Sequence, residues 1–211
     1  MSEAKLQITR LEVGPVRTNC YLVCNEETKE VIIFDPGENG VQISNHIKEN
    51  GWTLKAILLT HGHFDHISAV DELRKAFQVP VYAHEAEKEV LENPNYNCSL
   101  VFGSPQVSIT ADEYVTDGQI LSMVGCEITV IYTPGHTVGG CCYYFKEQHI
   151  LISGDTLFHT TIGRTDLPTG SYASLATSVK EKLFVLPDDT KVLPGHESTT
   201  TIGFEKQYNM L

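Results

Sequence analysis

Four side chains that can bind a metal ion occur within six residues, directly after an apolar run. The run is Ala56–Leu59, and the polar segment after it reads THGHFDH from Thr60. Its four candidate ligands are His61, His63, Asp65 and His66. Imidazole rings packed this densely lose hydration and repel one another unless a cation collects them. The chain must therefore fold so that a strand buried on both faces ends in an ion-binding loop.

The spacing inside this loop divides the candidate ligands into two groups. His61 and His63 lie two residues apart on extended backbone, so their side chains project to one side and can bind one ion. Asp65 and His66, where the chain turns into a helix, point toward a second position nearby, and Gly62 lets the loop fold tightly between them. A polar loop that only caps a strand is the alternative, and it suits one isolated histidine better than this cluster.

Three further candidates each follow a small residue at the end of a strand-like run. They are His136 in TPGHT, Asp155 in SGDT and His196 in PGHE. The glycine before each one allows a sharp turn that brings the next side chain to the rim of a sheet. Any one of the three alone is typical of an ordinary turn. As a set, they supply the ligands that the first loop lacks.

The number of candidate ligands predicts a centre for two metal ions. The expected ligands are His61, His63 and His136 for one ion, Asp65, His66 and His196 for the other, and Asp155 as a bridge between them. Two ions about 3.5 Å apart can share a hydroxide, lower the pKa of bound water toward about 7 and polarise a carbonyl. Metal-assisted hydrolysis is therefore the expected reaction, with Asp65 and Asp155 as catalytic residues. Zinc is the expected metal, and iron and manganese accept the same ligands.

The apolar pattern predicts an α/β chain of two similar halves. Strands are expected at Leu6–Val13, Cys20–Cys24, Val31–Phe34, Ala56–Leu59, Val79–Ala83, Cys126–Tyr132, Cys141–Phe145, Ile150–Ser153 and Lys191–Leu193. Helices are expected at Val41–Glu49, Ser68–Phe77, Glu85–Leu91, Tyr172–Leu183 and from about Thr201. Residues 93 to about 118 show no clear periodicity. Strands followed by helices in each half favour two packed sheets with helices outside, in a single domain of residues 1–211.

Charge and composition limit the partners of this chain. Its formal net charge is −12, and no basic stripe offers a surface for nucleic acid. No uncharged stretch is long enough to cross a bilayer, and the N-terminus lacks the pattern of a signal peptide, so we expect a cytoplasmic protein without a membrane partner. The six cysteines include no CxxC pair and lie in apolar or strand-like segments, which predicts reduced thiols rather than disulfides. Cys20 and Cys24 are spaced closely enough to suggest a metal site, but their strand pattern favours buried thiols. A small molecule remains the expected partner.

The ligand pattern closely resembles that of the metallo-β-lactamase superfamily over nearly the whole chain. The hallmark of that superfamily is an HxHxDH loop followed by His, Asp and His, which matches His61 to His66, His136, Asp155 and His196. The resemblance implies a four-layered αββα sandwich of two similar halves. It also implies that Asp35, in an early Asp-Pro-Gly turn, supports the metal-binding loop from behind the ligands.

Within that superfamily the chain resembles the short glyoxalase II-like, or hydroxyacylglutathione hydrolase-like, enzymes. The similar segments are NCYL at 19–22, PGHT at 134–137, GDT at 154–156 and IGRTD at 162–166. The resemblance implies hydrolysis of thioesters such as S-lactoylglutathione. Full-length enzymes of that type add a C-terminal helical domain that holds glutathione, which we do not expect in a sequence that ends at Leu211. Candidate contacts to substrate are Arg164, His159 and Tyr172, and Arg164 either clamps a substrate carboxylate or pairs with Asp166.

Other activities compete with this hypothesis. Persulfide dioxygenases share the fold and a Gly-Arg-Thr-Asp element but hold a single iron. The seven candidate ligands of this chain favour two ions instead. Metallo-β-lactamases proper often carry Cys where this chain has Asp155, and RNA-processing relatives need basic surfaces that this sequence lacks. A non-catalytic metal-binding domain would need closed, thiolate-rich coordination. The set of His and Asp ligands therefore favours a hydrolase.

Overall fold

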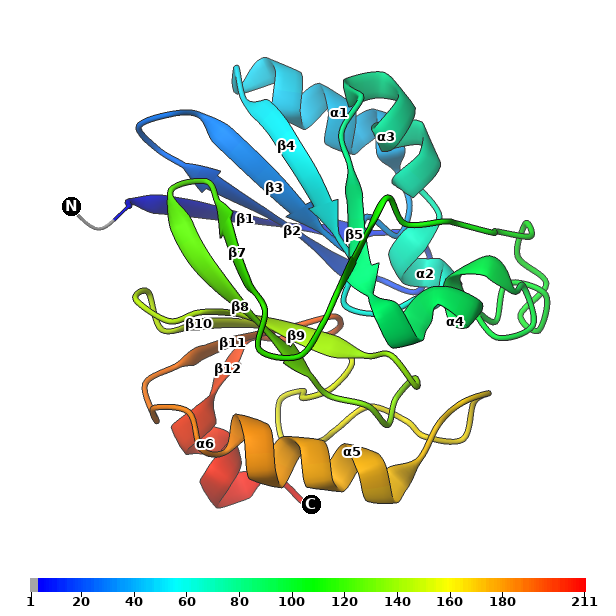
Figure 1. Ribbon diagram of the computed structural model, residues 1–211, viewed down its shortest axis with the longest axis vertical. Coiled ribbons are helices and arrows are strands. Elements are labelled where there is room, and N and C mark those ends of the chain that lie inside the picture. Colours follow the sequence, from blue (N-terminus) through cyan, green and yellow to red (C-terminus); the bar gives the residue numbers. More distant parts are fainter. Residues whose placement is uncertain (1–3) are drawn as a thin grey trace.

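The computed structural model describes residues 4–211 and contains two six-stranded sheets that face each other, with helices on both outer sides (Figure 1). Each half of the chain builds one sheet and the helices that cover it. The order of layers is therefore helix, sheet, sheet, helix. This arrangement confirms the predicted four-layered αββα sandwich.

The first sheet has the strand order β1-β2-β3-β4-β5-β6. Its strands are β1 Leu6–Val13, β2 Thr18–Asn25, β3 Glu30–Phe34, β4 Thr53–Leu58, β5 Val81–His84 and β6 Glu113–Val115. The helices of this half are α1 Gly40–Glu49, α2 Phe64–Ile67, α3 Val70–Phe77, the 3₁₀ turn η1 Glu85–Glu87 and α4 Lys88–Glu92. β3, β4, β5 and β6 pair in parallel, so their carboxyl ends lie at the same edge of the sheet.

The second sheet has the order β12-β11-β10-β9-β8-β7. Its strands are β7 Ile120–Met123, β8 Cys126–Tyr132, β9 Cys141–Phe145, β10 Ile150–Gly154, β11 Lys191–Pro194 and β12 Thr200–Thr201. Its helices are α5 Tyr172–Ser178, which continues as the π-helical segment η2 Val179–Leu183, and α6 Ile202–Tyr208. β10 and β11 pair in parallel, and their other neighbours in the sheet are antiparallel.

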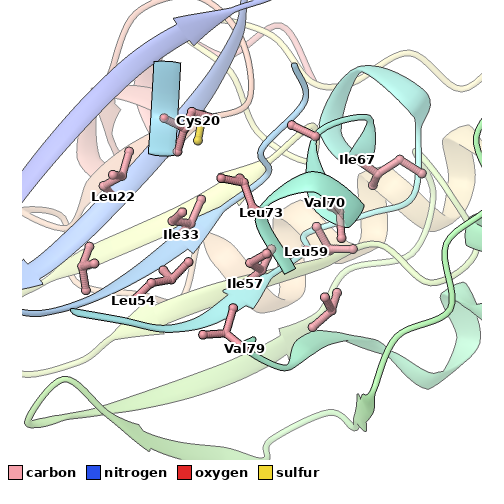
Figure 2. Packing of buried hydrophobic residues seen from close by; sticks show 14 of the residues in the cluster. Cys20, Leu22, Ile33, Leu54, Ile57, Leu59, Ile67, Val70, Leu73 and Val79 are labelled. Atoms are coloured by element: carbon pink, nitrogen blue, oxygen red, sulfur yellow. The ribbon is translucent and has the colours of Figure 1, made fainter. Parts of the chain in front are cut away.

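Apolar side chains fill the space between all four layers. Ile33 and Ile57 of the first sheet pack against Val70 and Leu73 of α3 (Figure 2). Between the two sheets, the ring of Phe34 lies 5.3 Å from that of Tyr143. Every residue of β2 is buried because both faces of the first sheet are covered.

Local sequence explains where these elements begin and end. In α3, Val70 and Leu73 are buried, and the helix ends at Gln78, whose left-handed backbone (φ 54°) makes the usual C-terminal turn. The side chain of Ser171 accepts a hydrogen bond from the Ser174 N–H and so caps α5. All six cysteines are buried, which confirms the predicted burial of Cys20 and Cys24.

Within residues 4–211, no helix combines the length and the apolar character that crossing a bilayer requires.

Candidate metal centre

Polar side chains meet where four strands from both sheets end. His61 follows β4, His136 follows β8, Asp155 follows β10 and His196 follows β11. These turns bring all seven residues predicted as ligands together in one cluster. The ends of the two sheets thus form a common site.

The first group consists of His61, His63 and His136. Each offers a ring nitrogen within 4.8 Å of the others, and all three side chains are buried. The Nδ1 atom of His63 lies 2.9 Å from Nε2 of His136. Burial, reinforced by the neighbouring histidines, holds the pKa values of His61 and His63 well below the ordinary range. At neutral pH these two rings are uncharged and present lone pairs to a cation.

The second group consists of Asp65, His66 and His196, whose ligand atoms also lie within 4.8 Å of one another. Burial alone would lower the pKa of His66, but nearby carboxylates, led by Asp155 and Asp65, outweigh it and raise this pKa to about 10. Burial would likewise raise the pKa of Asp65, but the charge of His66 and a hydrogen bond with His196 lower it. Without a metal ion, this group therefore combines protonated His66 with ionised Asp65.

Asp155 lies between the two groups. One of its oxygens is 3.5 Å from Nε2 of His136 in the first group and 3.5 Å from Nε2 of His196 in the second. Its other oxygen is 3.4 Å from Nε2 of His66. Gly195 makes this approach possible, because a Cβ atom there would lie 2.2 Å from the Asp155 carboxylate.

The cluster leaves buried polar atoms that a cation would satisfy. Among residues 4–211, Nε2 of His61, Nε2 of His63 and Oδ1 of Asp155 are buried without a hydrogen-bond partner. Such atoms cost free energy unless something binds them. Imidazole nitrogens and carboxylate oxygens are ligands that zinc, iron and manganese accept. The residues present therefore fit metal ions.

Asp35 and the carbonyl of Arg164 contact the Nδ1 atoms of two candidate ligands, His66 and His136. Asp35 accepts hydrogen bonds from the N–H of Thr60 at 2.8 Å and from its hydroxyl at 2.6 Å, and lies 3.1 Å from Nδ1 of His66. Nδ1 of His136 donates to the carbonyl of Arg164 at 2.8 Å. Asp35, His61 and His66 also lie close enough to bind an ion, but Thr60 already engages both Asp35 oxygens. Asp35 is therefore placed to orient His66.

Glu87 joins the loops that carry the two histidine segments. Its buried carboxylate accepts hydrogen bonds from the Gly62 N–H at 2.7 Å, the Thr137 hydroxyl at 3.0 Å and the Gly139 N–H at 2.7 Å. Burial raises the pKa of Glu87 to about 7 against the opposing effect of these three donors. Nothing in the sequence distinguishes this residue, because Glu87 stands among similar glutamates in an acidic segment.

A cavity of about 390 Å³ opens above the centre. Its lining includes the candidate ligands His63, Asp65, His136, Asp155 and His196. Arg164 also lines it and makes two 2.7 Å hydrogen bonds to the carboxylate of Asp166, so the ion-pair alternative for this arginine is realised.

The other two predicted substrate contacts lie elsewhere in the described part of the chain. The ring of His159 stacks on Phe204 of α6 at 4.9 Å, and Tyr172 is 60% exposed at the start of α5. Neither residue is among those that line the cavity.

The cluster of candidate ligands matches a known protein family. A family model described as the metallo-beta-lactamase superfamily matches residues 13–196, which include all seven candidate ligands. The chain belongs to the metallo-beta-lactamase superfamily. This superfamily assignment confirms the resemblance found in the sequence, and with the clustered ligands it makes the protein a metal-dependent hydrolase.

Two metallo-beta-lactamase superfamily relatives cover nearly the full length. Probable metallo-hydrolase YqgX of Bacillus subtilis is 41% identical over 201 residues, which are 95% of this chain and 94% of that protein. Hydroxyacylglutathione hydrolase GloC of Haemophilus influenzae is 35% identical over 204 residues, which are 94% of this chain and 96% of that protein.

Two solved structures are also similar to this metallo-beta-lactamase superfamily member. BLEG-1 B3 metallo-beta-lactamase has a TM-score of 0.92 and 40% identity, with 97% of this chain and 98% of that chain covered. TTHA1623 in a di-iron-bound form has a TM-score of 0.86 and 33% identity, with 96% and 98% covered. The names of these similar proteins differ in substrate and metal, so the substrate of this chain must be argued from its own cavity.

Proposed function

We propose that this protein is a binuclear metal-dependent hydrolase, a single domain of residues 1–211 that cleaves thioesters of S-acyl thiol conjugates, the class of S-lactoylglutathione. The observation that carries the proposal is the position of Asp155, within 3.5 Å of ring nitrogens from both ligand groups. A carboxylate placed between two cations offsets their mutual repulsion. Zinc is the proposed metal, because it accepts this donor set and brings no redox chemistry.

The chain's own residues supply the binding and the orientation that hydrolysis needs. Ions held here would polarise the thioester carbonyl and lower the pKa of water toward about 7. The lowered pKa values of His61 and His63 keep their lone pairs available at neutral pH. The carboxylate of Asp65 lines the cavity, where it can accept a hydrogen bond from a water and direct the water oxygen toward the carbonyl. Asp65 and Asp155 are the proposed catalytic carboxylates.

The relatives support the choice of substrate class. GloC, whose name gives hydroxyacylglutathione as its substrate, covers 94% of this chain at 35% identity. BLEG-1 is named a B3 metallo-beta-lactamase, so a β-lactam belongs in any substrate panel. The cavity lining includes five of the seven candidate ligands, so a carbonyl group from either kind of molecule would lie beside the metal centre there.

The proposal predicts that protein loaded with zinc contains two ions per chain and cleaves S-lactoylglutathione without consuming oxygen. Asp155→Asn should lose both ions together, and its kcat/KM should fall by at least about a hundredfold. Mutation of residues that only orient metal ligands already lowers metal affinity or activity by about 10- to 100-fold. Elemental analysis, a thiol-release assay and an oxygen electrode make these measurements.

The matched control is Asp189→Asn, which removes a charge from an exposed carboxylate that pairs with His149. It should keep both ions and normal turnover. Stoichiometric oxygen uptake with glutathione persulfide and one iron per chain would instead assign a dioxygenase. Preferential cleavage of a β-lactam, or metal binding without turnover of any substrate, would also contradict the proposal.

A further inference from the structure

The cavity above the metal centre has apolar walls. Six side chains form them, contributed by separate segments of the chain: Val16, Phe64, Cys98, Phe102, Phe158 and Leu167. The rings of Phe64 and Phe102 lie 5.9 Å apart. Phe102 is 53% exposed and Val16 is 47% exposed, although both face a site that is polar at its base. Exposed apolar groups gathered at a cavity mark a binding surface for an apolar group.

The apolar walls reach the reacting position. Phe64 lines the cavity beside the preceding candidate ligand, His63. On another wall, the ring of Phe158 lies 6.2 Å from that of the candidate ligand His196. A carbonyl group held at the centre would therefore have aromatic side chains beside it on two sides. Whatever is bonded to that carbonyl enters an apolar environment at once.

The arginine side chains around the cavity have carboxylate neighbours. Among the described residues that line the cavity, Arg164 is the one arginine or lysine, and the carboxylate of Asp166 pairs with it through two hydrogen bonds. The adjoining groove contains Arg10 and Arg17, but Glu12 forms an ion pair with Arg17 at 2.8 Å and Glu197 lies in the same groove. Away from the metal centre, whose ions carry positive charge of their own, neither region has an arginine left unpaired to bind a carboxylate at the far end of an acyl group. Burying a carboxylate against such walls without a partner is costly.

We infer that the substrate is a thioester with an apolar acyl group and that Phe64, Phe102 and Phe158 select it. This inference rests on the proposed thioester hydrolase and narrows its substrate class. In the reaction, a water oxygen bonds to the carbonyl carbon and the carbon–sulfur bond breaks. One proton of the water leaves with the thiol, and the carboxylic acid releases the other at neutral pH.

Acyl chain length tests the inference quantitatively. Full burial of one methylene group favours binding by about fourfold. Along a series from acetyl to hexanoyl on one neutral thiol, N-acetylcysteamine, kcat/KM should therefore rise by at least about tenfold. The succinyl thioester, which ends in a carboxylate, should be at least about tenfold poorer than the butyryl thioester. Hexanoyl-glutathione should have no higher kcat/KM than the hexanoyl thioester of N-acetylcysteamine.

Variants at Phe102 test whether the apolar cavity wall causes the preference for long acyl chains. Phe102→Ser should reduce the ratio of hexanoyl to acetyl kcat/KM by at least about fivefold, whereas Phe102→Leu should retain it, because an apolar side chain remains. Val185→Ala is the control, since Val185 is 71% exposed and does not line the cavity. Thermal unfolding and metal content of each variant show whether the fold and the centre are intact.

The outcomes separate this inference from the proposed function. Hydrolysis of all thioesters at equal rates, or a tenfold preference for the glutathione carrier, would overturn the apolar selection and leave the hydrolase in place. An unchanged ratio in Phe102→Ser with full metal content would also overturn it. Failure to cleave any thioester with both ions bound would contradict the proposed function and the inference with it.

Discussion

Glu87 shows how a single buried carboxylate can determine the shape of the site without lining its cavity. It accepts hydrogen bonds from backbone N–H groups of two different loops, one on each carboxylate oxygen. Gly62 lies between His61 and His63, and Gly139 follows His136 by three residues. The distance between these loops therefore depends on a side chain that is not itself a candidate ligand.

Glu87→Gln should weaken both stability and metal binding. An amide has one oxygen and one NH2 group, so in either orientation the NH2 group faces a backbone N–H of Gly62 or Gly139. We expect a loss of about 1–3 kcal/mol in the free energy of unfolding. We also expect about tenfold weaker metal binding, measured by competition with a chromophoric chelator.

Glu205→Gln is the matched control for this substitution. Glu205 is also buried and accepts hydrogen bonds from the Thr160 N–H and the Thr200 hydroxyl, and neither threonine is a candidate ligand. Its replacement should reduce stability and leave metal affinity unchanged. Equal effects of the two variants on metal affinity would show that Glu87 acts only through general stability.

At the scale of elements, the sequence predicted most strands and all ligand-bearing turns. Cys126–Tyr132 and Cys141–Phe145 have the predicted bounds as β8 and β9, because apolar residues recur there without interruption by turn residues. The ligands were predictable because four of them cluster directly after one apolar run and each of the other three follows a strand and a glycine. Their convergence needed the pairing of distant strands, which local patterns indicate only through the number of ligands.

The elements that sequence analysis missed are short or depend on tertiary contacts. β6 has three residues and β12 has two, fewer than a periodic pattern needs. In β7, Ile120 is exposed while Leu121 is buried, so hydrophobicity does not report burial there. The predicted helix Tyr172–Leu183 is present but becomes π-helical from Val179, which no periodicity of 3.6 residues can show.

The loop after β8 packs against η1 so closely that one position tolerates only glycine. A Cβ atom at Gly139 would lie 2.2 Å from the backbone N of Glu87. Gly139→Ala should therefore separate the loop from η1 and lower the free energy of unfolding by about 2–3 kcal/mol, in the range of overpacked buried positions. Denaturant titration measures this loss.

The neighbouring glycine provides the comparison. At Gly140 the nearest atoms to an added Cβ are 3.3 Å away, a gap that small shifts can relieve. Gly140→Ala should cost less than about 1 kcal/mol. If both alanine variants were equally stable, close approach at Gly139 would not be what holds the loop against η1.

At the scale of the molecule, metal ions should stabilise the fold, and the effect should grow with pH. In the metal-free protein the pKa of His66 is raised to about 10. A raised pKa contributes stability that is complete below the unfolded value near 6.5 and is lost as pH rises through the folded value. The metal-bound protein has no such proton to lose, because His66 must release it to bind.

A chelator should therefore lower Tm at pH 6.5 and lower it further at pH 8 and 9.5. At a free metal concentration of about a thousand times Kd the stabilisation is about 4 kcal/mol, or roughly 8–16 °C in a chain of this size. Differential scanning calorimetry with and without chelator measures the difference. A constant or shrinking difference between pH 6.5 and 9.5 would contradict the assigned protonation of His66.

Each ligand group draws on both sheets. The first half of the chain supplies His61 and His63 to one group and Asp65 and His66 to the other, and His136 and His196 of the second half complete them. Neither half alone holds three ligands of one group. Metal affinity therefore depends on how well the two halves of the chain pack together. A substitution that disturbs their shared apolar interface should weaken metal binding even when it lies far from the cavity.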